Sequence, residues 1–266
     1  MVDPALIARL TELFLAYRDN AAENTPVVWL SGAQGSGKST ISAILARELP
    51  FHIEVLSLDD FYLPRQHRLK LAKTVSPLFE TRGPPGTHEI SRLGDALDAL
   101  QNGLPKTGLV VPKFDKTIDD RIDGERVITE QPDLVLVEGW MLGVEPDHRS
   151  LGDNPLNAVE QNDFDLAWRT YQEDLLQQKY KPLWEDDDFI YLLAPDFSHV
   201  LDWRSQQEIE NYAAEKIEIP SQQFERITER NSEFIQYYER LTRRILTGGR
   251  ENGHALTIDG KRNLIE

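Results

Sequence analysis

The stretch Gly32-Ala33-Gln34-Gly35-Ser36-Gly37-Lys38-Ser39 reads G-x-x-x-x-G-K-S, and it decides the fold. This pattern is typical of the loop that binds the phosphates of a nucleoside triphosphate. The apolar run Val27–Ser31 before it suits a buried strand. Apolar residues recur after it at helical spacing, at Ile41, Ile44, Leu45 and Leu49. A Gly/Ser-rich loop can match the pattern by chance, but a strand before it and a helix after it favour the functional interpretation.

The chemistry of phosphate binding explains why these residue types are needed. Successive backbone N–H groups must point at phosphate oxygens, and glycines permit the close approach. A helix that starts at Lys38 adds free N–H donors and the positive end of its dipole. We expect Lys38 to hold the β- and γ-phosphates and the Ser39 hydroxyl to ligate Mg²⁺. The expected nucleotide-binding residues are Gly32, Ala33, Gln34, Gly35, Ser36, Gly37, Lys38, Ser39 and Thr40.

Composition narrows the classes of protein to which the chain can belong. Its 266 residues carry a formal net charge of −16 and show no basic stripe, so we expect no nucleic-acid partner. The absence of cysteine excludes disulfides, cysteine nucleophiles and zinc–thiolate sites. No apolar run is long enough to span a membrane, and residues 1–17 read as an amphipathic helix. We therefore expect a cytoplasmic protein with no membrane partner, whose oligomeric state the sequence does not indicate.

Two carboxylates follow apolar strands that the sequence predicts. The run 53–58 leads into Asp59, and the nearly pure apolar run 134–137 leads into Glu138. Ligands bind at the carboxyl edge of an open α/β sheet. Asp59 is therefore a candidate base that takes a proton from an alcohol, and Glu138 is a candidate carboxylate of a Mg-nucleotide site. Two other roles remain open at this point. Asp59 or Asp60 is also suited to cap a turn, and Glu138 is also suited to pair with a neighbouring base.

Between these strands the sequence predicts an excursion from the sheet, over about residues 62–130. Residues 64–89 are rich in Arg, Lys, His, Pro and Gly without clear periodicity, as in a loop that binds an anionic substrate or in an ordinary surface loop. Ser91 is a suitable cap for a helix that Gly103 ends. The run 109–115 reads as a strand, and with residues 126–128 it indicates an irregular hairpin.

The rest of the chain continues the alternation of strands and helices. Residues 144–163 read as a long loop, and aromatic residues at 164, 168 and 171 are expected to pack in the core from a helix over 164–183. Strands are expected at 189–194 and 255–259, and helices at 198–216 and 221–246. This order predicts an α/β fold of the P-loop NTPase type, with a mostly parallel sheet covered by helices on both faces. We expect one domain over residues 1–266, with an N-terminal helix over about 1–20.

Several segments together resemble D-glycerate 3-kinases, which belong with phosphoribulokinase, uridine kinase and bacterial pantothenate kinase among the P-loop small-molecule kinases. The resemblance covers residues 27–266. Its least specific part is the phosphate loop; the most specific parts are the R-G-x-P-G-T-H stretch from Arg82 and the F-D-K-T-x-D-D-R stretch from Phe114. The matching segments are the phosphate loop, Ser57–Tyr62, Arg82–Glu89, Pro112–Lys116 and Val137–Trp140.

The resemblance implies a role for each matched residue. Asp59 corresponds to the carboxylate that activates the acceptor hydroxyl, and Glu138 to the acid near the metal. With Lys38 and Asp59, Arg204 completes the expected catalytic set, because it lies where related kinases have a lid. One departure is Glu89, where the family stretch has Asp. The residues expected to shape the acceptor pocket are Asp60, Tyr62, Arg82, His88, Lys113, Asp115, Lys116 and Arg121.

The resulting hypothesis is an enzyme that uses ATP and Mg²⁺ to phosphorylate a hydroxyl of D-glycerate, giving 3-phosphoglycerate. Arg82 and Arg121 are candidates for holding the carboxylate of glycerate, since a guanidinium can donate two parallel hydrogen bonds to it. Two alternatives remain. One is a kinase for another small alcohol such as pantothenate or uridine, and the other is a nucleotide-binding regulatory protein. Asp59 favours a kinase, because a regulator has no acceptor hydroxyl to deprotonate.

Overall fold

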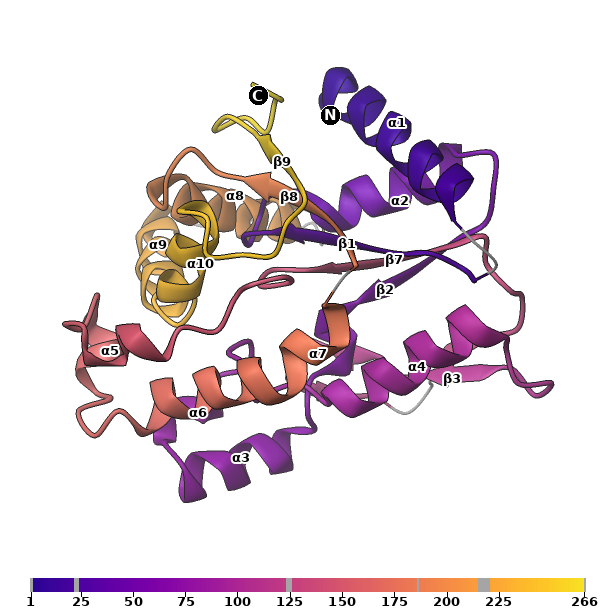
Figure 1. Cartoon of the computed structure of the whole chain (residues 1–266). Helices are drawn as coiled ribbons and strands as arrows, with labels where there is room; N and C mark the ends of the chain where they lie inside the picture. Colours follow the sequence, from indigo (N-terminus) through magenta and orange to yellow (C-terminus); the bar gives the residue numbers. More distant parts are fainter. Residues whose placement is uncertain (1, 22–23, 123–125, 186, 215–220, 266) are drawn as a thin grey trace.

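A central sheet of parallel strands organises the molecule (Figure 1). The computed structural model describes residues 2–21, 24–122, 126–185, 187–214 and 221–265, with the side chains of 211–214 and 221–227 left out. Within these ranges five strands lie in the order β2-β7-β1-β8-β9, and all neighbouring pairs are parallel. Their bounds are β1 Val27–Gly32, β2 Ile53–Ser57, β7 Leu134–Gly139, β8 Asp188–Leu193 and β9 His254–Thr257.

The strands are apolar on both sides because both faces of the sheet are covered. In β1, Val27 and Trp29 pack into the core on one face, while Val28 and Leu30 pack into the core on the other. Strands β7 and β8 alternate in the same way. Every residue of β1 and β7 is buried, which is why each strand begins with four consecutive apolar residues.

Helices cover both faces of the sheet (Figure 1). Helices α1 (Pro4–Asn20) and α2 (Lys38–Glu48) lie on one face, where Leu6, Leu10 and Phe14 join the core. The other face is covered by α4 (Ile90–Asn102), α6 (Ala167–Leu175), the π-helix η4 (Leu176–Tyr180) and α7 (Lys181–Trp184). The expected α/β class is confirmed. In the described part of the chain, no helix has the length and apolar character needed to cross a membrane.

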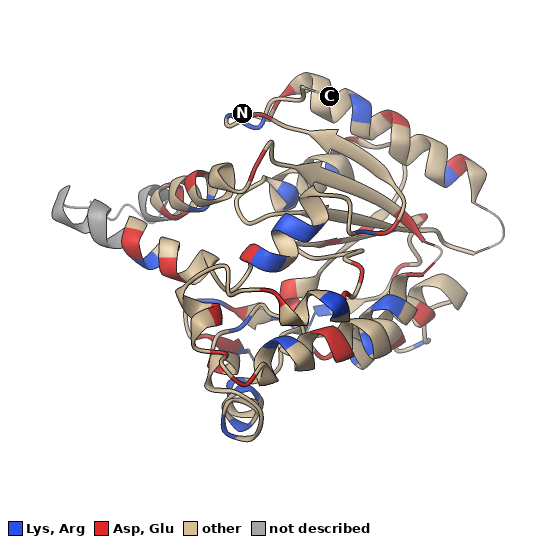
Figure 2. Ribbon diagram, turned by 60° about the vertical axis from the view of Figure 1, so that its left-hand side comes forward, with Lys and Arg blue, Asp and Glu red and all other residues tan. Residues whose placement is uncertain are grey.

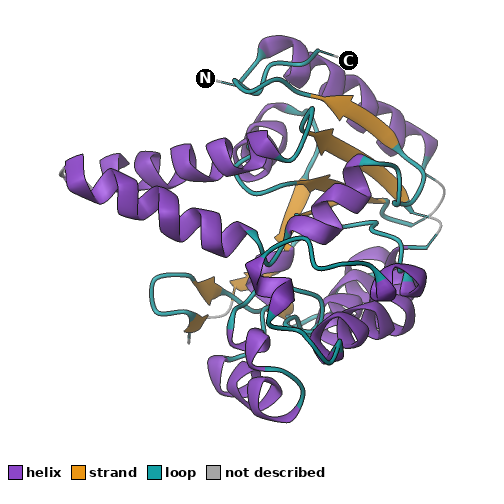
Figure 3. Ribbon diagram, turned by 90° about the vertical axis from the view of Figure 1, so that its left-hand side faces the viewer, coloured by secondary structure: helices purple, strands orange, loops and turns teal. Residues whose placement is uncertain are grey.

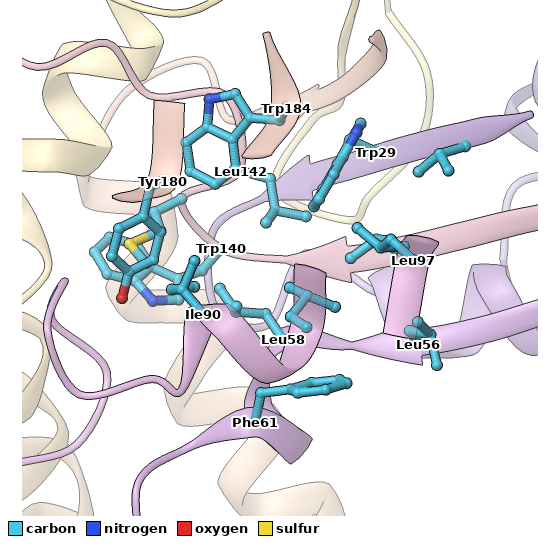
Figure 4. Packing of buried hydrophobic residues seen from close by; sticks show 14 of the residues in the cluster. Trp29, Leu56, Leu58, Phe61, Ile90, Leu97, Trp140, Leu142, Tyr180 and Trp184 are labelled. Atoms are coloured by element: carbon cyan, nitrogen blue, oxygen red, sulfur yellow. The ribbon is translucent and has the colours of Figure 1, made fainter. Parts of the chain in front are cut away.

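Aromatic rings fill the second of these faces (Figure 4). The Trp29 ring lies edge-on to Trp184, with ring centroids 5.8 Å apart, and stacks on Phe189 at 6.1 Å. The Trp29 indole N–H donates to Asp187 Oδ2 at 2.7 Å, so this buried donor is satisfied. The aromatic packing ties β1, which precedes the phosphate loop, to β8 and α7.

The excursion between β2 and β7 contains more helix than the sequence indicated. It begins with the 3₁₀ helix η1 (Leu58–Phe61) and includes α3 (Arg65–Thr74), η2 (Pro77–Glu80) and α4. The expectation of an aperiodic loop over 64–89 was wrong for α3. The residue that α3 buries is Arg68, so the helix shows no apolar stripe in its sequence.

The strand expected over 109–115 is two strands that pair with different partners. β3 (Leu109–Val111) pairs with β6 (Arg126–Ile128), and β4 (Phe114–Asp115) pairs with β5 (Asp120–Arg121), both antiparallel. Pro112 follows β3 directly, and because proline has no N–H it cannot continue the ladder.

Three helices after β8 stand at the carboxyl edge of the sheet. Helices α8 (Ser198–Ala214) and α9 (Ser221–Ile235) run side by side away from the rest of the molecule (Figure 3). The chain then turns into α10 (Glu239–Leu246), so the single helix expected over 221–246 is interrupted at 236–238. Residues 215 and 216 of the helix expected over 198–216 lie outside the described residues.

Two local expectations were wrong. The helix expected from residue 164 begins as α6 at Ala167, because the Asp163 carboxylate accepts the backbone N–H groups of Trp168 and Arg169. Phe164 therefore lies outside the helix and is 89% exposed, not packed in the core. Helix α4 begins at Ile90, so Ser91 lies inside it and does not cap it.

The loop expected over 144–163 contains η3 (His148–Gly152) and the short helix α5 (Ala158–Gln161). It is joined to α6 and α10 by buried ion pairs. Glu160 accepts from Arg240, and Asp163 accepts from Arg169 at 3.0 Å. These pairs fix the approach of α10, whose preceding turn reaches the candidate site. On the helices positive and negative side chains are interspersed (Figure 2).

Candidate active site

The phosphate loop needs glycine at two positions. Gly35 and Gly37 have φ angles of +75° and +94°, in the left-handed region that favours glycine. A Cβ at Gly35 would lie 2.5 Å from the carbonyl oxygen of Trp203, so a side chain has no room there. Gly37 directly precedes the first turn of α2, where the free N–H groups of the helix begin. The loop therefore presents backbone donors at the start of a helix, as the sequence predicted.

Lys38 is held inside this loop. Its ammonium donates to the carbonyl oxygens of Gly32 at 2.6 Å and Ala33 at 3.0 Å, and its side chain is largely buried. Burial lowers the pKa of Lys38, and the charges of Glu138 and Asp59 oppose this effect. Ser36 Oγ is also buried, without a hydrogen-bond partner in the described ranges. An anion bound in the loop would pair with both groups.

Glu138 lies beside the loop because of strand register. Leu30 of β1 and Ser57 of β2 both pair with Glu138 of β7. The Ser39 hydroxyl donates to Glu138 Oε1 at 3.2 Å, so a hydroxyl and a carboxylate face each other next to the phosphate loop. No group of three or more His, Cys, Asp or Glu gathers for a metal within the described ranges. Two protein oxygens nevertheless suit Mg²⁺, which usually binds one or two carboxylates together with substrate phosphates.

Asp59 lies in η1, directly after β2, and two side chains hold its carboxylate. The Lys116 ammonium is 2.6 Å from Asp59 Oδ2, and the Tyr62 hydroxyl donates to Asp59 Oδ1 at 2.8 Å. Burial alone would raise the pKa of Asp59, but the Lys116 charge and these two hydrogen bonds hold it well below its usual range. Asp59 is therefore a carboxylate throughout the physiological pH range.

These groups surround one small cavity of about 100 Å³. It lies at the carboxyl edge of the sheet, between the phosphate loop, η1 and helices α8 and α9. Ten of the residues expected at the site line it, namely Gln34, Gly35, Lys38, Ser39, Asp59, Tyr62, Arg82, Lys116, Glu138 and Arg204. Asp59, Lys38 and Glu138 thus meet in one place, although they come from three separate strand ends.

Five further residues line the cavity that the sequence did not single out: Gly139, Trp140, Gln207, Phe234 and Tyr238. Gly139 and Trp140 belong to the family segment Val137–Trp140, so their position directly after Glu138 was the sequence signal that could have identified them. Phe234 and Tyr238 showed only helical spacing, which is as typical of core packing.

Two aromatic side chains hold the backbone of the segment that carries Arg82. The Tyr238 hydroxyl donates to the Arg82 carbonyl at 2.8 Å, and the Trp140 indole N–H donates to the Gly83 carbonyl at 3.2 Å. The φ angle of Gly83 is +117°, and a Cβ there would lie 2.2 Å from the Tyr238 hydroxyl. Glycine at position 83 therefore leaves room for Tyr238, in the turn before α10, to pack against the segment that carries Arg82.

Arg204 reaches the cavity from α8. Its guanidinium pairs with Glu208 Oε2 at 2.9 Å, donates to Gln207 Oε1 at 3.0 Å and lies 5.4 Å from the centre of the Phe234 ring on α9. Glu208 also pairs with Arg230 of α9, so Arg204 belongs to the contacts that join the two projecting helices.

Five residues expected to shape the acceptor pocket do not line this cavity. Asp60 Oδ1 accepts the Phe114 backbone N–H at 3.2 Å, so it holds β4. Asp115 Oδ1 accepts from the Thr117 backbone and hydroxyl in a turn, and Lys113 is exposed.

Arg121 and His88 are engaged elsewhere. Arg121 pairs with Glu89 at 2.7 Å and donates from Nε to the Tyr62 carbonyl at 2.8 Å, so its guanidinium ties η1 to the start of α4. The His88 ring stacks on Tyr62 with centroids 4.6 Å apart, and burial lowers its pKa to about 3. His88 is thus a neutral support for Tyr62. Of the two arginines considered for an acceptor carboxylate, the structure brings Arg82 to the cavity.

Several loop residues also border a second cavity of about 330 Å³. Gly35, Ser36, Gly37 and Thr40 contribute to its lining, as does Arg262, whose Nε donates to the Gly35 carbonyl at 2.6 Å. Gly32 and Ala33 act instead through their carbonyls, which hold Lys38.

Comparison with known proteins shows what this arrangement resembles. An uncharacterized kinase of Schizosaccharomyces pombe is 32% identical over 200 residues, which cover 68% of this chain and 69% of that protein. A probable ATP-dependent kinase of Saccharomyces cerevisiae is 30% identical over 203 residues, covering 69% of this chain and 67% of that protein. The solved D-glycerate 3-kinase of Cryptococcus neoformans var. grubii has the same fold, with a TM-score of 0.78 at 24% identity over 98% of each chain. No family model matches the chain.

The geometry of Glu138 leads to a prediction about metal dependence. Replacing Glu138 by Gln should raise the Mg²⁺ concentration needed for half-maximal ATP binding by on the order of tenfold, because a neutral amide oxygen is a weaker ligand than a carboxylate. Titration of Mg²⁺ against ATP binding measures this shift. Glu130→Gln, at an exposed position, is the matched control. An unchanged Mg²⁺ requirement in Glu138→Gln would contradict the assignment.

Proposed function

The chain belongs to the family of P-loop small-molecule kinases that includes these two yeast proteins, and on that premise we propose that it transfers the γ-phosphoryl group of ATP to the C3 hydroxyl of D-glycerate. The product would be 3-phosphoglycerate. Membership of the P-loop kinases confirms the resemblance found in the residues, and ATP-dependent phosphoryl transfer follows from it. The choice of glycerate as acceptor is the proposal.

One observation carries the choice of acceptor: Arg82 lies in the same small cavity as Lys38 and Asp59. A cavity of this kind would hold a short molecule between a guanidinium and a carboxylate. Glycerate has a carboxylate for the first and a hydroxyl for the second. A guanidinium has five N–H donors in a planar fork, which matches a carboxylate well.

Phosphoryl transfer needs positioning and neutralisation of charge more than covalent chemistry. The loop amides and Lys38 would hold the phosphates, and Arg204 would approach the transferred group from α8. Ser39 and Glu138 would hold Mg²⁺, which supplies positive charge to the phosphate oxygens. Partners within the chain hold these side chains in the cavity: the Gly32 and Ala33 carbonyls hold Lys38, Glu138 holds Ser39, and Glu208 holds Arg204.

The low pKa of Asp59 decides how it would act. A carboxylate with a depressed pKa is a weak base, so Asp59 would chiefly orient the acceptor hydroxyl. In a loose transition state the hydroxyl proton leaves late, when the new P–O bond has made it acidic, and Asp59 then accepts it. Lys116, at 2.6 Å from Asp59, keeps the carboxylate ionised and in place until then.

The alternatives fit the cavity less well. Uridine would need an exposed aromatic face and base-edge partners. The Phe234 ring is covered by Arg204, and the Tyr238 hydroxyl is used on the Arg82 carbonyl. Pantothenate separates its carboxylate from its primary hydroxyl by a longer chain than glycerate does, whereas Arg82 and Asp59 line the same small cavity. A regulatory protein would have no use for Asp59 beside the phosphate loop.

A screen of acceptors tests the proposed function. With Mg-ATP, we expect ADP release to depend on D-glycerate more strongly than on glycerol, pantothenate or uridine, because of these four only glycerate carries a carboxylate and a primary hydroxyl within three carbons. A coupled assay for ADP gives the rates. Faster turnover with pantothenate or uridine would show that this compound, and not glycerate, is the acceptor. ADP release that no acceptor changes would support the regulatory alternative.

Arg82 is expected to serve the acceptor and not the nucleotide. Arg82→Ala should raise the KM for glycerate roughly 10- to 100-fold, the usual consequence of losing a hydrogen-bonded charge contact, and should leave the KM for ATP nearly unchanged. Steady-state kinetics with each substrate varied in turn separates the two constants. An effect confined to the KM for ATP would remove Arg82 from acceptor binding.

Asp59→Asn is expected to affect turnover while Mg-ATP still binds. The amide keeps the shape of the carboxylate but does not act as a base and has no charge to pair with the Lys116 ammonium, so kcat should fall ~100- to 10,000-fold.

The neighbouring Asp60 supplies the matched control for Asp59→Asn. Its carboxylate accepts the Phe114 backbone N–H, which an amide oxygen can also do, so Asp60→Asn should stay active. If Asp60→Asn were the inactive variant and Asp59→Asn the active one, the base would be misplaced by one residue.

A further inference from the structure

Two arginines converge on one carboxylate just behind the acceptor side of the cavity. Asp119 Oδ2 accepts from Arg68 at 2.9 Å, and Asp119 Oδ1 accepts from Arg82. The Asp119 backbone carbonyl accepts from Arg68 as well, at 2.6 Å. Each oxygen of Asp119 therefore has its own guanidinium partner, and Asp119 is the link between Arg82 and Arg68. The residue does not line the cavity itself.

Arg68 is a fixed anchor. Only 1% of it is exposed, and its guanidinium also donates to the Glu80 carbonyl at 3.0 Å. It is held by η2 on one side and by the turn before β5 on the other. Asp119 has a φ angle of +54°, a left-handed conformation that aspartate tolerates better than most residues. The position of the Asp119 carboxylate is therefore set by the backbone and by a buried charge.

Arg82 is the more exposed arginine of the two. It is partly exposed to the cavity, and its guanidinium lies 5.6 Å from the centre of the Phe114 ring. Arg68 lies 5.9 Å from the centre of the same ring. Two positive charges therefore lie beside one ring with Asp119 bonded to both. Without that carboxylate they would repel each other, and Arg82 would turn away because Arg68 is buried.

We infer that Asp119 is a positioning residue for acceptor recognition, which holds the Arg82 guanidinium where a small carboxylic acid binds. This inference rests on the proposed function. Asp119 uses one side of the Arg82 guanidinium, and the remaining N–H donors are available to the acceptor. Two arginines share one carboxylate, so the cluster of Arg68, Asp119 and Arg82 keeps one net positive charge for the acceptor.

A competing effect has the opposite sign. The negative charge of Asp119 also repels an acceptor carboxylate, so removing it could strengthen binding. Arg68 neutralises much of this repulsion, because it is paired with Asp119 at 2.9 Å. The positioning effect is therefore expected to prevail, and the sign of the change in KM distinguishes the two effects.

Asp119→Asn should raise the KM for D-glycerate about tenfold, while the KM for ATP and kcat at saturating glycerate stay near their wild-type values. Asp120→Asn is the matched control, because the partners of the Asp120 carboxylate in the described part of the chain are the backbone N–H groups of Arg65 and Arg121, which an amide oxygen can also accept. A lower KM for glycerate in Asp119→Asn, or equal effects on both substrates, would overturn the inference.

A double-mutant cycle shows whether Asp119 acts through Arg82. In an Arg82→Ala background, Asp119→Asn should cause no further rise in the KM for glycerate. If the two effects multiply, Asp119 has a separate role and the inference fails. Should Asp119→Asn fold poorly because Arg68 is left unpaired, the double variant Arg68→Met/Asp119→Asn removes both charges of the pair. It should show the same raised KM, and an unchanged KM would contradict the inference.

Wild-type kinetics separates this inference from the function on which it rests. If the wild-type protein releases no ADP in response to glycerate, the proposed function and the role of Asp119 both fail. If the wild type turns over glycerate and Asp119→Asn has an unchanged KM, the role of Asp119 alone fails.

Discussion

The parallel register of β2, β7 and β1 is the constraint on which the candidate site depends. Glu138 of β7 pairs with Leu30 of β1 on one side and with Ser57 of β2 on the other. All three strands point the same way, so the phosphate loop, Asp59 and Glu138 must emerge at one edge of the sheet. A shift of the pairing by one residue would turn every side chain of the strand to the opposite face, so that each would have to pack in the other of the two buried cores. The two buried cores thus hold the strand register that brings these three groups together.

A second layer of contacts turns this edge into a cavity for a small molecule. Asp60 holds β4 by the Phe114 backbone, while Asp119 and Tyr238 hold Arg82 from the two sides. Many of these contacts are ion pairs between partly buried side chains, such as Arg82 with Asp119 and Arg121 with Glu89. Because an unpaired charge there would be costly, the pairs favour one arrangement of the acceptor side. The arrangement leaves Arg82 beside Asp59 and the phosphate loop.

The sequence predicted those parts of the site that depend on residues close together in the chain. A glycine-rich loop between an apolar run and a helix, and an acid directly after an apolar run, were sufficient to place Lys38, Asp59 and Glu138 at one edge. The sequence could not choose between Arg82 and Arg121, because the pairing of Arg121 with Glu89 is a tertiary contact. It missed α3 because that helix buries Arg68 in place of apolar residues. It missed Tyr238 because a helical spacing of aromatic residues looks the same in a core and in a binding site.

The central claim is that this edge of the sheet joins the γ-phosphoryl of ATP to the C3 hydroxyl of D-glycerate. ³¹P NMR of the protein with Mg-ATP and D-glycerate observes the product directly. The account predicts loss of the γ-phosphate signal and growth of a phosphate monoester signal split by the methylene protons at C3, in step with ADP. Release of inorganic phosphate alone, at a rate that glycerate does not change, would contradict it.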